Sequence, residues 1–384
     1  NWESYHAIVK SLKELEDDET LVVQSGMPVA VFKTHKYAPV VVMATTNFMR
    51  PSWETFYDLE AKNLTIFAQY TAAPWEYIGT QGVIEGTFET LAAVGIKHYG
   101  GNMENRILLT AGAGGMGGNQ TWAMKMHGGV AIVIDADIET LERRVAKNYL
   151  DEIVGSLDEA IEKAKKCAAE KTPHSFGVVG NAADLFEEAF AKGFMPDVVT
   201  EMCPCHDPVS YIPSGYTPEQ ARELRNADID KYLELARATM KRQLAVMLKY
   251  LDKGVPAFEY GTSIRKECRD AGFPEAEAMR LPAFVADYIR PLFCEGRGPF
   301  RWTCISGDPA DLKRTDELAM ELFGDDPIVG RWIPLASKHL PIEALPARIC
   351  YMGFGQRKRF ALAVNDLIKK GEIKGPVAFS RDNL

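Results

Sequence analysis

The sequence contains no apolar run long enough to cross a membrane, and it has no excess of positive charge. A membrane-spanning helix needs about 18 or more consecutive apolar residues, and none occurs in the 384 residues. The 53 acidic side chains outnumber the 44 basic ones, so the net charge is -9. A surface with this balance does not attract a polyanion. We therefore expect neither a membrane span nor a nucleic-acid partner.

Cysteine pairs, a secretory leader and several common catalytic motifs are also lacking. The seven cysteines are scattered and form no disulfide framework, and a chain of this length needs no disulfides for stability. No signal peptide is visible. These features favour the cytoplasm. The sequence has no G-x-S-x-G elbow and no P-loop lysine, so neither a serine hydrolase nor a P-loop nucleotidase is indicated.

A glycine-rich stretch over residues 107–118 carries the strongest signal in the chain. Three apolar residues lead into a G-x-G-x-x-G motif formed by Gly112, Gly114 and Gly117. In a nucleotide-binding turn, the first glycine allows the tight turn, the second lets the backbone approach a pyrophosphate, and the third lets helix and strand pack closely. The N-terminus of the following helix attracts the phosphate charge.

The residues after this motif supply the rest of a dinucleotide-binding unit. Gln120 to His127 is predicted as a short helix, and Val130 to Ile134 as a buried strand that ends in Asp135. An acidic residue at that point accepts hydrogen bonds from a ribose diol, which favours NAD over NADP. The alternative is a glycine-rich turn without a ligand. The agreement of strand, turn, helix, second strand and acidic residue favours NAD+ as the cofactor.

The rest of the chain alternates between strands and helices, which predicts an α/β fold with a parallel sheet. We expect a Rossmann-like NAD domain over residues 77–285, inserted into a second α/β core domain formed by residues 1–76 and 286–384. The other predicted elements are an amphipathic helix from Trp2, three short strands between Thr20 and Met43, helices over 88–96, 157–170 and 184–192, strands over 175–179 and 196–200, a long helical region over 217–253 and a strand over 257–261.

Cys203, Cys205 and His206 form a cluster past the fourth predicted strand of the NAD domain. A closed zinc site needs four ligands, and the other cysteines provide no second pair, so we expect no metal. A reactive thiol or a shaped loop beside the cofactor fits better. His206 is the histidine that we expect in the site, because it follows a strand's carboxyl end and precedes Asp207.

Two candidate residues lie in the last third of the chain. Arg301 stands between Phe300 and Trp302, where its guanidinium could clamp a substrate carboxylate with two parallel hydrogen bonds. A buried structural arginine is the equally plain alternative. Cys350 follows an apolar run and by itself indicates only an inert buried thiol. On the fold alone, a dehydrogenase would be the default function.

The chain resembles the urocanases (urocanate hydratases) along its whole length. The matching motifs, in order, are Gln24-Ser25-Gly26, Phe32-Lys33-Thr34-His35, Tyr77-Ile78-Gly79-Thr80-Gln81-Gly82, Thr110-Ala111-Gly112, Gly114-Gly115-Met116-Gly117-Gly118, Gly180-Asn181-Ala182-Ala183, His206-Asp207-Pro208, Tyr288-Ile289-Arg290-Pro291-Leu292-Phe293-Cys294, Gly298-Pro299-Phe300-Arg301-Trp302 and Leu345-Pro346-Ala347-Arg348-Ile349-Cys350. The resemblance implies a cytoplasmic homodimer with tightly bound NAD+. The cofactor would act as an electrophile toward the imidazole ring of an imidazole acrylate substrate, and water would be added without net redox.

Carried over motif by motif, the resemblance also implies which residues form the site. The residues expected to contact NAD+ are Gln69, Gly115, Met116, Gly117, Asp135, Asn181, Ala182, Met202, Cys203, Cys205, His206, Tyr211, Ile212 and Tyr260. The expected catalytic residues are Cys350, Arg301, His206 and Asp382.

Several positions depart from the urocanase pattern. Asp135 replaces a glutamate, Thr140 replaces an arginine, residues 202–205 replace Q-T-S-A, and Thr262-Ser263 replaces two asparagines. Because these changes gain Met and Cys near the cofactor, a urocanate with sulfur on its ring, such as thiourocanate or its S-methyl form, is a second substrate candidate beside urocanate. An NAD-dependent dehydrogenase and a catalytically inactive NAD-binding paralogue are the alternatives.

The urocanase pattern also has parts beyond this sequence. A glycine-rich segment with a tyrosine is expected before Asn1, and a histidine- and glycine-rich portion after Leu384. We therefore expect this chain by itself to be incomplete as a catalyst.

Overall fold

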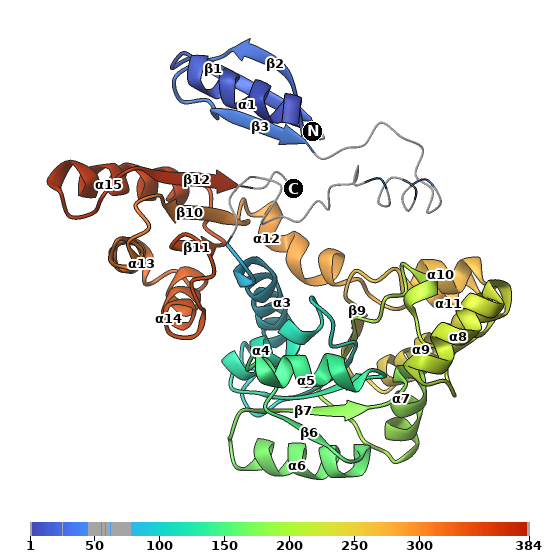
Figure 1. Cartoon of the computed structure of the whole chain (residues 1–384). Coiled ribbons are helices and arrows are strands. Elements are labelled where there is room, and N and C mark those ends of the chain that lie inside the picture. Colours follow the sequence, from blue (N-terminus) through green and yellow to red (C-terminus); the bar gives the residue numbers. More distant parts are fainter. Residues whose placement is uncertain are drawn as a thin grey trace.

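The computed structural model describes residues 2–24, 26–44 and 78–381, together with Thr55, Asp58 and Lys62. These residues form a mixed α/β protein with three sheets (Figure 1). None of the described helices is both long enough and apolar enough to span a bilayer.

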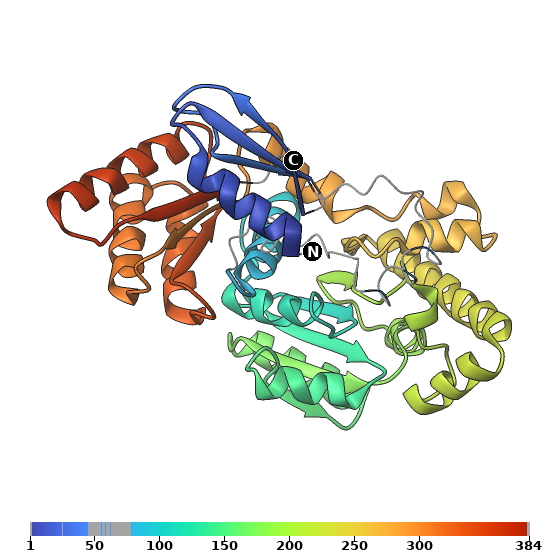
Figure 2. The same ribbon diagram turned by 45° about the horizontal axis from the view of Figure 1, so that its top comes forward.

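One helix covers a small sheet at the N-terminus. Figure 2 shows α1 lying across these strands, whose order is β2-β1-β3. Ile8 of the helix packs with Leu21 and Val23, which are buried. The predicted helix and three strands are therefore confirmed. Their bounds are α1 (Trp2–Glu14), β1 (Glu19–Gln24), β2 (Met27–Lys33) and β3 (Val41–Ala44).

A six-stranded parallel sheet is the largest of the three sheets and the central one in chain order. Its order is β6-β7-β5-β4-β8-β9, and every neighbouring pair is parallel. The residues of β4 are all buried, as a strand covered by helices on both faces requires. The predicted α/β class with a parallel sheet is confirmed. The elements of this part are α3 (Gln81–Tyr99), β4 (Ile107–Ala111), α4 (Gly118–Met126), β5 (Val130–Asp135), α5 (Ile138–Ala146), β6 (Glu152–Val154), α6 (Leu157–Ala169), β7 (His174–Val179), α7 (Ala182–Ala191), β8 (Val198–Glu201), η1 (Pro208–Ser210), α8 (Pro218–Ala227), α9 (Ile229–Asp252), β9 (Ala257–Glu259), α10 (Ile264–Asp270) and α11 (Glu275–Ala278).

The strand order reverses direction at β4. After β4 the chain places β5, β6 and β7 on one side, where their order away from β4 is β5, β7, β6. It then returns to place β8 and β9 on the other side. The carboxyl ends of β4 and β8 therefore border the topological switch point, where open α/β sheets bind their ligands. The glycine turn follows β4, and the Met202–His206 loop follows β8.

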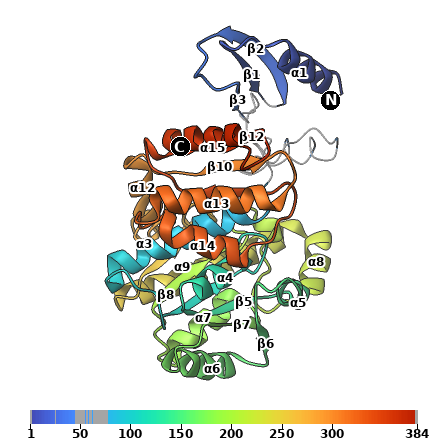
Figure 3. The same cartoon turned by 90° about the vertical axis from the view of Figure 1, so that its left-hand side faces the viewer.

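A three-stranded antiparallel sheet forms the C-terminal part. Its order is β11-β10-β12, and α13, α14 and α15 surround it (Figure 3). Trp302, Trp332 and Phe360 are fully buried there. The elements are η2 (Val285–Ile289), α12 (Arg290–Cys294), β10 (Phe300–Cys304), α13 (Pro309–Phe323), α14 (Val329–His339), β11 (Ala347–Cys350), α15 (Gln356–Lys370) and β12 (Val377–Arg381).

Helix α3 joins the central sheet to the C-terminal one. It runs between α4 and the C-terminal strands in Figures 1 and 3. Ile84 and Phe88 of α3 belong to one apolar cluster that contains Leu108 of β4 as well as Trp302 of β10 and Trp332 of α14. The two sheets therefore share a core that is built around α3.

The structure differs from the expected element list, which ends at residue 261, in several places. Helix α3 begins at Gln81 rather than at Phe88. The helical region over 217–253 is two helices, because the Asp228 carboxylate caps α9 by accepting from the Lys231 N–H at 2.9 Å just where α8 ends. The sequence prediction also omits α5 and β6. Helix α5 buries only Leu141 and β6 has three residues, so neither produces a long periodic pattern.

Candidate functional site

The turn after β4 is so tight that only glycine fits at two of its positions. Gly112 has a φ of +81°, and a Cβ there would lie 2.4 Å from the Met202 carbonyl oxygen. A Cβ on Gly117 would lie 1.7 Å from the Gly112 carbonyl oxygen. Both contacts are with backbone, so no side-chain movement relieves them. The first and last glycines of the motif are required by the turn itself.

The middle of the same turn faces open space. A Cβ on Gly114 or Gly115 would meet no atom within 4 Å. The Asn119 side chain fixes the turn by donating from Nδ2 to the Gly115 carbonyl at 2.7 Å. The turn leads directly into the N-terminus of α4. An open glycine turn at a helix N-terminus is the arrangement that binds phosphate, so it fits the pyrophosphate of a dinucleotide.

Asp135 lies beside this turn at the end of β5. Its Oδ2 accepts from the Ala113 N–H at 2.7 Å, and its Oδ1 accepts from the Asp137 N–H at 2.9 Å. Burial raises the pKa of Asp135, although the two N–H groups oppose the shift. Each oxygen keeps a second lone pair, so the carboxylate both supports the turn and fits a ribose diol.

Thr140 stands on α5, near Asp135. Its hydroxyl donates to Asp137 at 2.8 Å and accepts from the Arg143 guanidinium at 2.7 Å. Residue 140 is not an arginine, but a guanidinium group still lies beside Asp137. It belongs to the exposed Arg143, which is one helical turn further along α5.

The loop after β8 is organised by Glu201, a residue that sequence reasoning missed. Glu201 is fully buried. Its carboxyl group accepts from the Cys203 N–H at 3.1 Å, from the Cys205 thiol at 3.9 Å and from the Thr262 hydroxyl. Burial raises the pKa of Glu201 to about 8, so the group is largely protonated at neutral pH.

The same loop lies against the glycine turn. The Met202 N–H donates to the Ala111 carbonyl at 2.7 Å. Cys203 and Cys205 are buried, and burial raises the pKa of both thiols well above the usual range. They are therefore neutral thiols rather than nucleophilic thiolates. Among the residues with described placement, no group of three or more His, Cys, Asp or Glu side chains is arranged to hold a metal ion.

Two further predicted residues meet at the edge of the sheet. The Asn181 side chain donates to the Ile212 carbonyl at 2.9 Å and caps α7 by accepting from the Ala183 N–H at 3.0 Å. The Tyr211 hydroxyl donates to Gln243 at 2.7 Å. The structure thus collects the predicted residues of the turn and of three loops at one edge. Gly115, Met116 and His206 are the exposed members of this set, and Ala182 is a buried one.

Helix α3 connects this edge to two other predicted residues. Near its N-terminus, the Thr80 hydroxyl donates to Asn119 at 3.1 Å, and Asn119 in turn holds the glycine turn. The Tyr260 hydroxyl donates to Thr87 at 3.1 Å and lies 3.3 Å from Thr90. The Glu85 carboxyl group accepts from the Tyr351 N–H at 2.8 Å, and Tyr351 follows Cys350 directly.

Arg301 and Cys350 lie on adjacent strands of the C-terminal sheet. Cys350 of β11 is opposite Phe300 of β10, and Ile349 is opposite Arg301. Both predicted residues are fully buried. Burial raises the pKa of the Cys350 thiol well above its usual range, with a further contribution from the carboxyl group of Glu85. Cys350 is therefore a neutral thiol.

Two buried carboxyl groups face the C-terminal sheet from α3. Glu85 and Glu89 are one turn apart and are both inaccessible to solvent. Glu89 is paired with Arg331 of α14 at 2.6 Å, and its pKa is raised to about 7 by burial. Burial raises the pKa of Glu85 well above its usual range. In the sequence, these two glutamates stand among the apolar residues Ile84, Phe88 and Leu91. That pattern indicates buried charged groups, and the sequence prediction did not use it.

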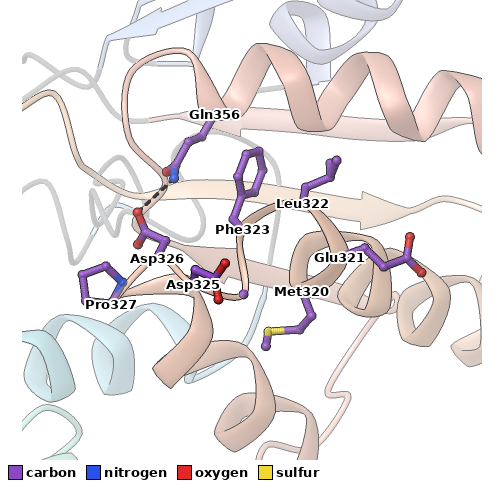
Figure 4. Close-up of a pocket in the computed structure, with 9 residues that line it drawn as sticks. Met320, Glu321, Leu322, Phe323, Asp325, Asp326, Pro327 and Gln356 are labelled. Carbon is purple, nitrogen blue, oxygen red and sulfur yellow. Dashed lines mark hydrogen bonds between the residues drawn. The ribbon is translucent and has the colours of Figure 1, made fainter.

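A separate pocket lies at the turn between α13 and α14 (Figure 4). It contains none of the predicted site residues. Its Asp326 holds Arg297 at 2.7 Å and Gln356 at 2.9 Å, as the dashed line to Gln356 shows. These bonds support the loop that follows Cys350. The lining residues are Met320, Glu321, Leu322, Phe323, Gly324, Asp325, Asp326, Pro327 and Gln356. Of the predicted site residues, Gln69 and Asp382 lie outside the described part of the chain.

Three family models together match almost the entire sequence. The urocanase N-terminal domain matches residues 1–76, the urocanase Rossmann-like domain matches residues 79–288, and the urocanase C-terminal domain matches residues 291–384. The second of these contains the whole six-stranded sheet, and the third contains Arg301 and Cys350.

Proposed function

The chain belongs to the urocanase family, and from that premise we propose that it is a hydro-lyase. In this proposal it adds water across the conjugated ring and propenoate chain of an imidazole acrylate, with tightly bound NAD+ and without net redox. The observation that carries the proposal is the match of all three urocanase domains in their order along the chain.

The proposed cofactor is NAD+, held at the switch point of the sheet. The open backbone at Gly115 would receive the pyrophosphate, and Asp135 would bind the ribose diol. The remaining predicted contacts come from the Met202–His206 loop and from Gln69, Met116, Gly117, Asn181, Ala182, Tyr211, Ile212 and Tyr260. When bound, NAD+ supplies an electron-accepting cation at its nicotinamide ring.

The proposed catalytic residues are Cys350, Arg301, His206 and Asp382. Arg301 is the anchor for the substrate carboxylate, because guanidinium and carboxylate match in charge and geometry. Cys350 acts as a neutral thiol, a form that burial enforces. His206, which is exposed, borders the cofactor loop, and it would exchange protons with solvent more readily than the buried groups.

The proposed substrate is urocanate or a urocanate modified on its ring with sulfur. Cys203, Cys205 and Thr262 support the second possibility, because these departures from the urocanase pattern converge on one carboxyl group, Glu201. In this proposal the three departures act together on the cofactor loop, because they share Glu201 as a partner. A changed loop beside the nicotinamide would alter which ring substituent fits.

We also propose the domain division 1–76 plus 286–384 around 77–285, a homodimeric assembly and a cytoplasmic location. The shared core around α3 supports a close association of the central and C-terminal parts.

A panel of substrates tests the proposed function. The intact protein, loaded with NAD+, should consume urocanate, thiourocanate or S-methyl thiourocanate, with loss of substrate absorbance and no accumulation of NADH. Stoichiometric NADH would identify a dehydrogenase instead. If none of the three substrates were consumed, the inactive NAD-binding paralogue would be favoured.

A further inference from the structure

Glu85 occupies a position between the nucleotide turn and Cys350. Thr80 bonds to Asn119 beside the glycine turn, and Glu85 bonds to the backbone that follows Cys350. An α-helix rises about 1.5 Å per residue, so these two contacts are separated by roughly 7–8 Å along α3. A residue placed there is within reach of a molecule that lies between the cofactor and Cys350.

Only half of the Glu85 carboxyl group is used within the described chain. Its Oε1 accepts from the Tyr351 N–H at 2.8 Å. Its Oε2 is buried and has no hydrogen-bond partner among the described residues. A buried polar atom without a partner carries a desolvation cost, and a ligand that bonds to it removes that cost.

Two arginines that contact residues of α3 from β11 and α14 are committed to other carboxylates. Arg348 binds Asp316 at 2.7 Å, and Arg331 binds Glu89 at 2.6 Å. Glu85 itself forms no ion pair within the described part of the chain. Burial therefore keeps it protonated, and its pKa is well above the usual range. A neutral carboxyl group in such a site can donate a hydrogen bond at neutral pH.

We propose that Glu85 is a substrate-contacting residue, and that its Oε2 hydroxyl donates a hydrogen bond to the acceptor nitrogen of the substrate's imidazole ring. This inference rests on the proposed function. The ring end suits Glu85 because a neutral donor matches a neutral acceptor, whereas the carboxylate end of the substrate suits the Arg301 cation. Glu85 would then set the orientation of the ring relative to Cys350.

Binding of two unreactive probes tests the inference. Imidazole propionate has a saturated chain, so it has no propenoate double bond to hydrate, and phenylpropionate has the same carboxylate without ring nitrogens. In calorimetry with the NAD-loaded intact protein, Glu85→Met should weaken imidazole propionate binding about tenfold or more and change phenylpropionate binding less than about twofold. Glu85→Gln keeps a donor in the same place, so it should retain imidazole propionate binding within about threefold.

Two further variants make the result decisive. Glu267→Met removes another buried helical glutamate, one that pairs with Lys266 on α10, and should change neither affinity. Glu85→Asp withdraws the carboxyl group by one methylene and should lose the preference for imidazole even if Glu85→Met does not fold.

Equal weakening of both probes by the Glu85 variants would show a structural role and overturn the inference. Unchanged binding of both probes would overturn it as well. If the unaltered protein bound neither probe, the proposed function would fail and the inference with it. If it bound imidazole propionate but hydrated no urocanate, the proposed function alone would fail, and the Glu85 variants would still decide the contact.

Discussion

At the scale of single residues, alanine substitution of two glycines in the same turn is expected to affect stability and NAD+ binding in opposite ways. A methyl group at Gly117 would meet the Gly112 carbonyl at 1.7 Å, whereas one at Gly115 would meet nothing within 4 Å. Gly117→Ala should therefore cost more than about 2 kcal/mol of unfolding free energy. Gly115→Ala should leave it within about 0.5 kcal/mol but weaken NAD+ binding, because the methyl group would occupy the open face.

Denaturant unfolding of the NAD-free protein and a cofactor titration separate the two effects. A stable Gly117→Ala variant would contradict the turn geometry. Unchanged NAD+ affinity in Gly115→Ala would contradict the placement of the pyrophosphate.

A pH effect on stability is expected from Glu201. Its ordinary pKa of 4.5 is raised to about 8 by burial in the folded chain. The folded state thus holds a proton that the unfolded state releases. The stabilisation is fully present below about pH 4.5 and is lost as the pH rises toward 8, by up to about 1.4 kcal/mol per pH unit. Glu201→Gln should flatten this decline in urea unfolding measured across that range. An identical slope in protein and variant would show that Glu201 is ionised when folded.

At the scale of elements, α3 is expected to transmit changes to the cofactor site. Asn119→Ala removes its hydrogen bonds with Thr80 and with the Gly115 carbonyl. Two such bonds together contribute about 1–3 kcal/mol, and the variant should also lose NAD+ affinity. Thr217→Ala is a matched control, because it breaks the capping box of α8 at a cost of about 1 kcal/mol. Equal NAD+ affinity in the two variants would contradict a role for α3 in holding the turn.

One ion pair joins α3 to α14 beside the apolar contact of Phe88 with Trp332. Arg331→Met leaves the buried Glu89 without its partner. Because the guanidinium is partly exposed, we expect a loss of about 2–3 kcal/mol, below the value for a fully buried pair. Adding Glu89→Gln should restore most of the stability in chemical unfolding. Additive losses in the double variant would show that the two side chains do not interact.

At the scale of the whole molecule, local sequence patterns predicted the parallel sheet. They did not predict how this sheet packs against the C-terminal part of the chain. The apolar run before Gly112 and the one before Asp135 identified their strands, because buried strands read as continuous apolar runs. The three-residue strand β6 gave no such pattern. Helix α3 was predicted only from Phe88 onward, since its first turns carry the polar residues Gln81 and Glu85. Their partners lie on β11 and directly after it.

In the candidate site, too, local features were predictable from the sequence and long-range contacts were not. The glycine turn and Asp135 are local in sequence, and their contact is present in the structure. Glu201 was missed because its burial results from packing between loops on different strands. The same holds for Glu85, whose partner is 266 positions away. Such long-range partners leave no periodic signal in either segment.

The proposed activity is the addition of water without transfer of hydride to free cofactor. The most direct test is mass spectrometry of the product made by the NAD-loaded intact protein in isotopically labelled water. A hydratase should give a product heavier than the substrate by one water molecule, with one labelled oxygen and with the NAD+ still oxidised. A product that differs from the substrate by hydrogen alone, together with reduced cofactor, would contradict it.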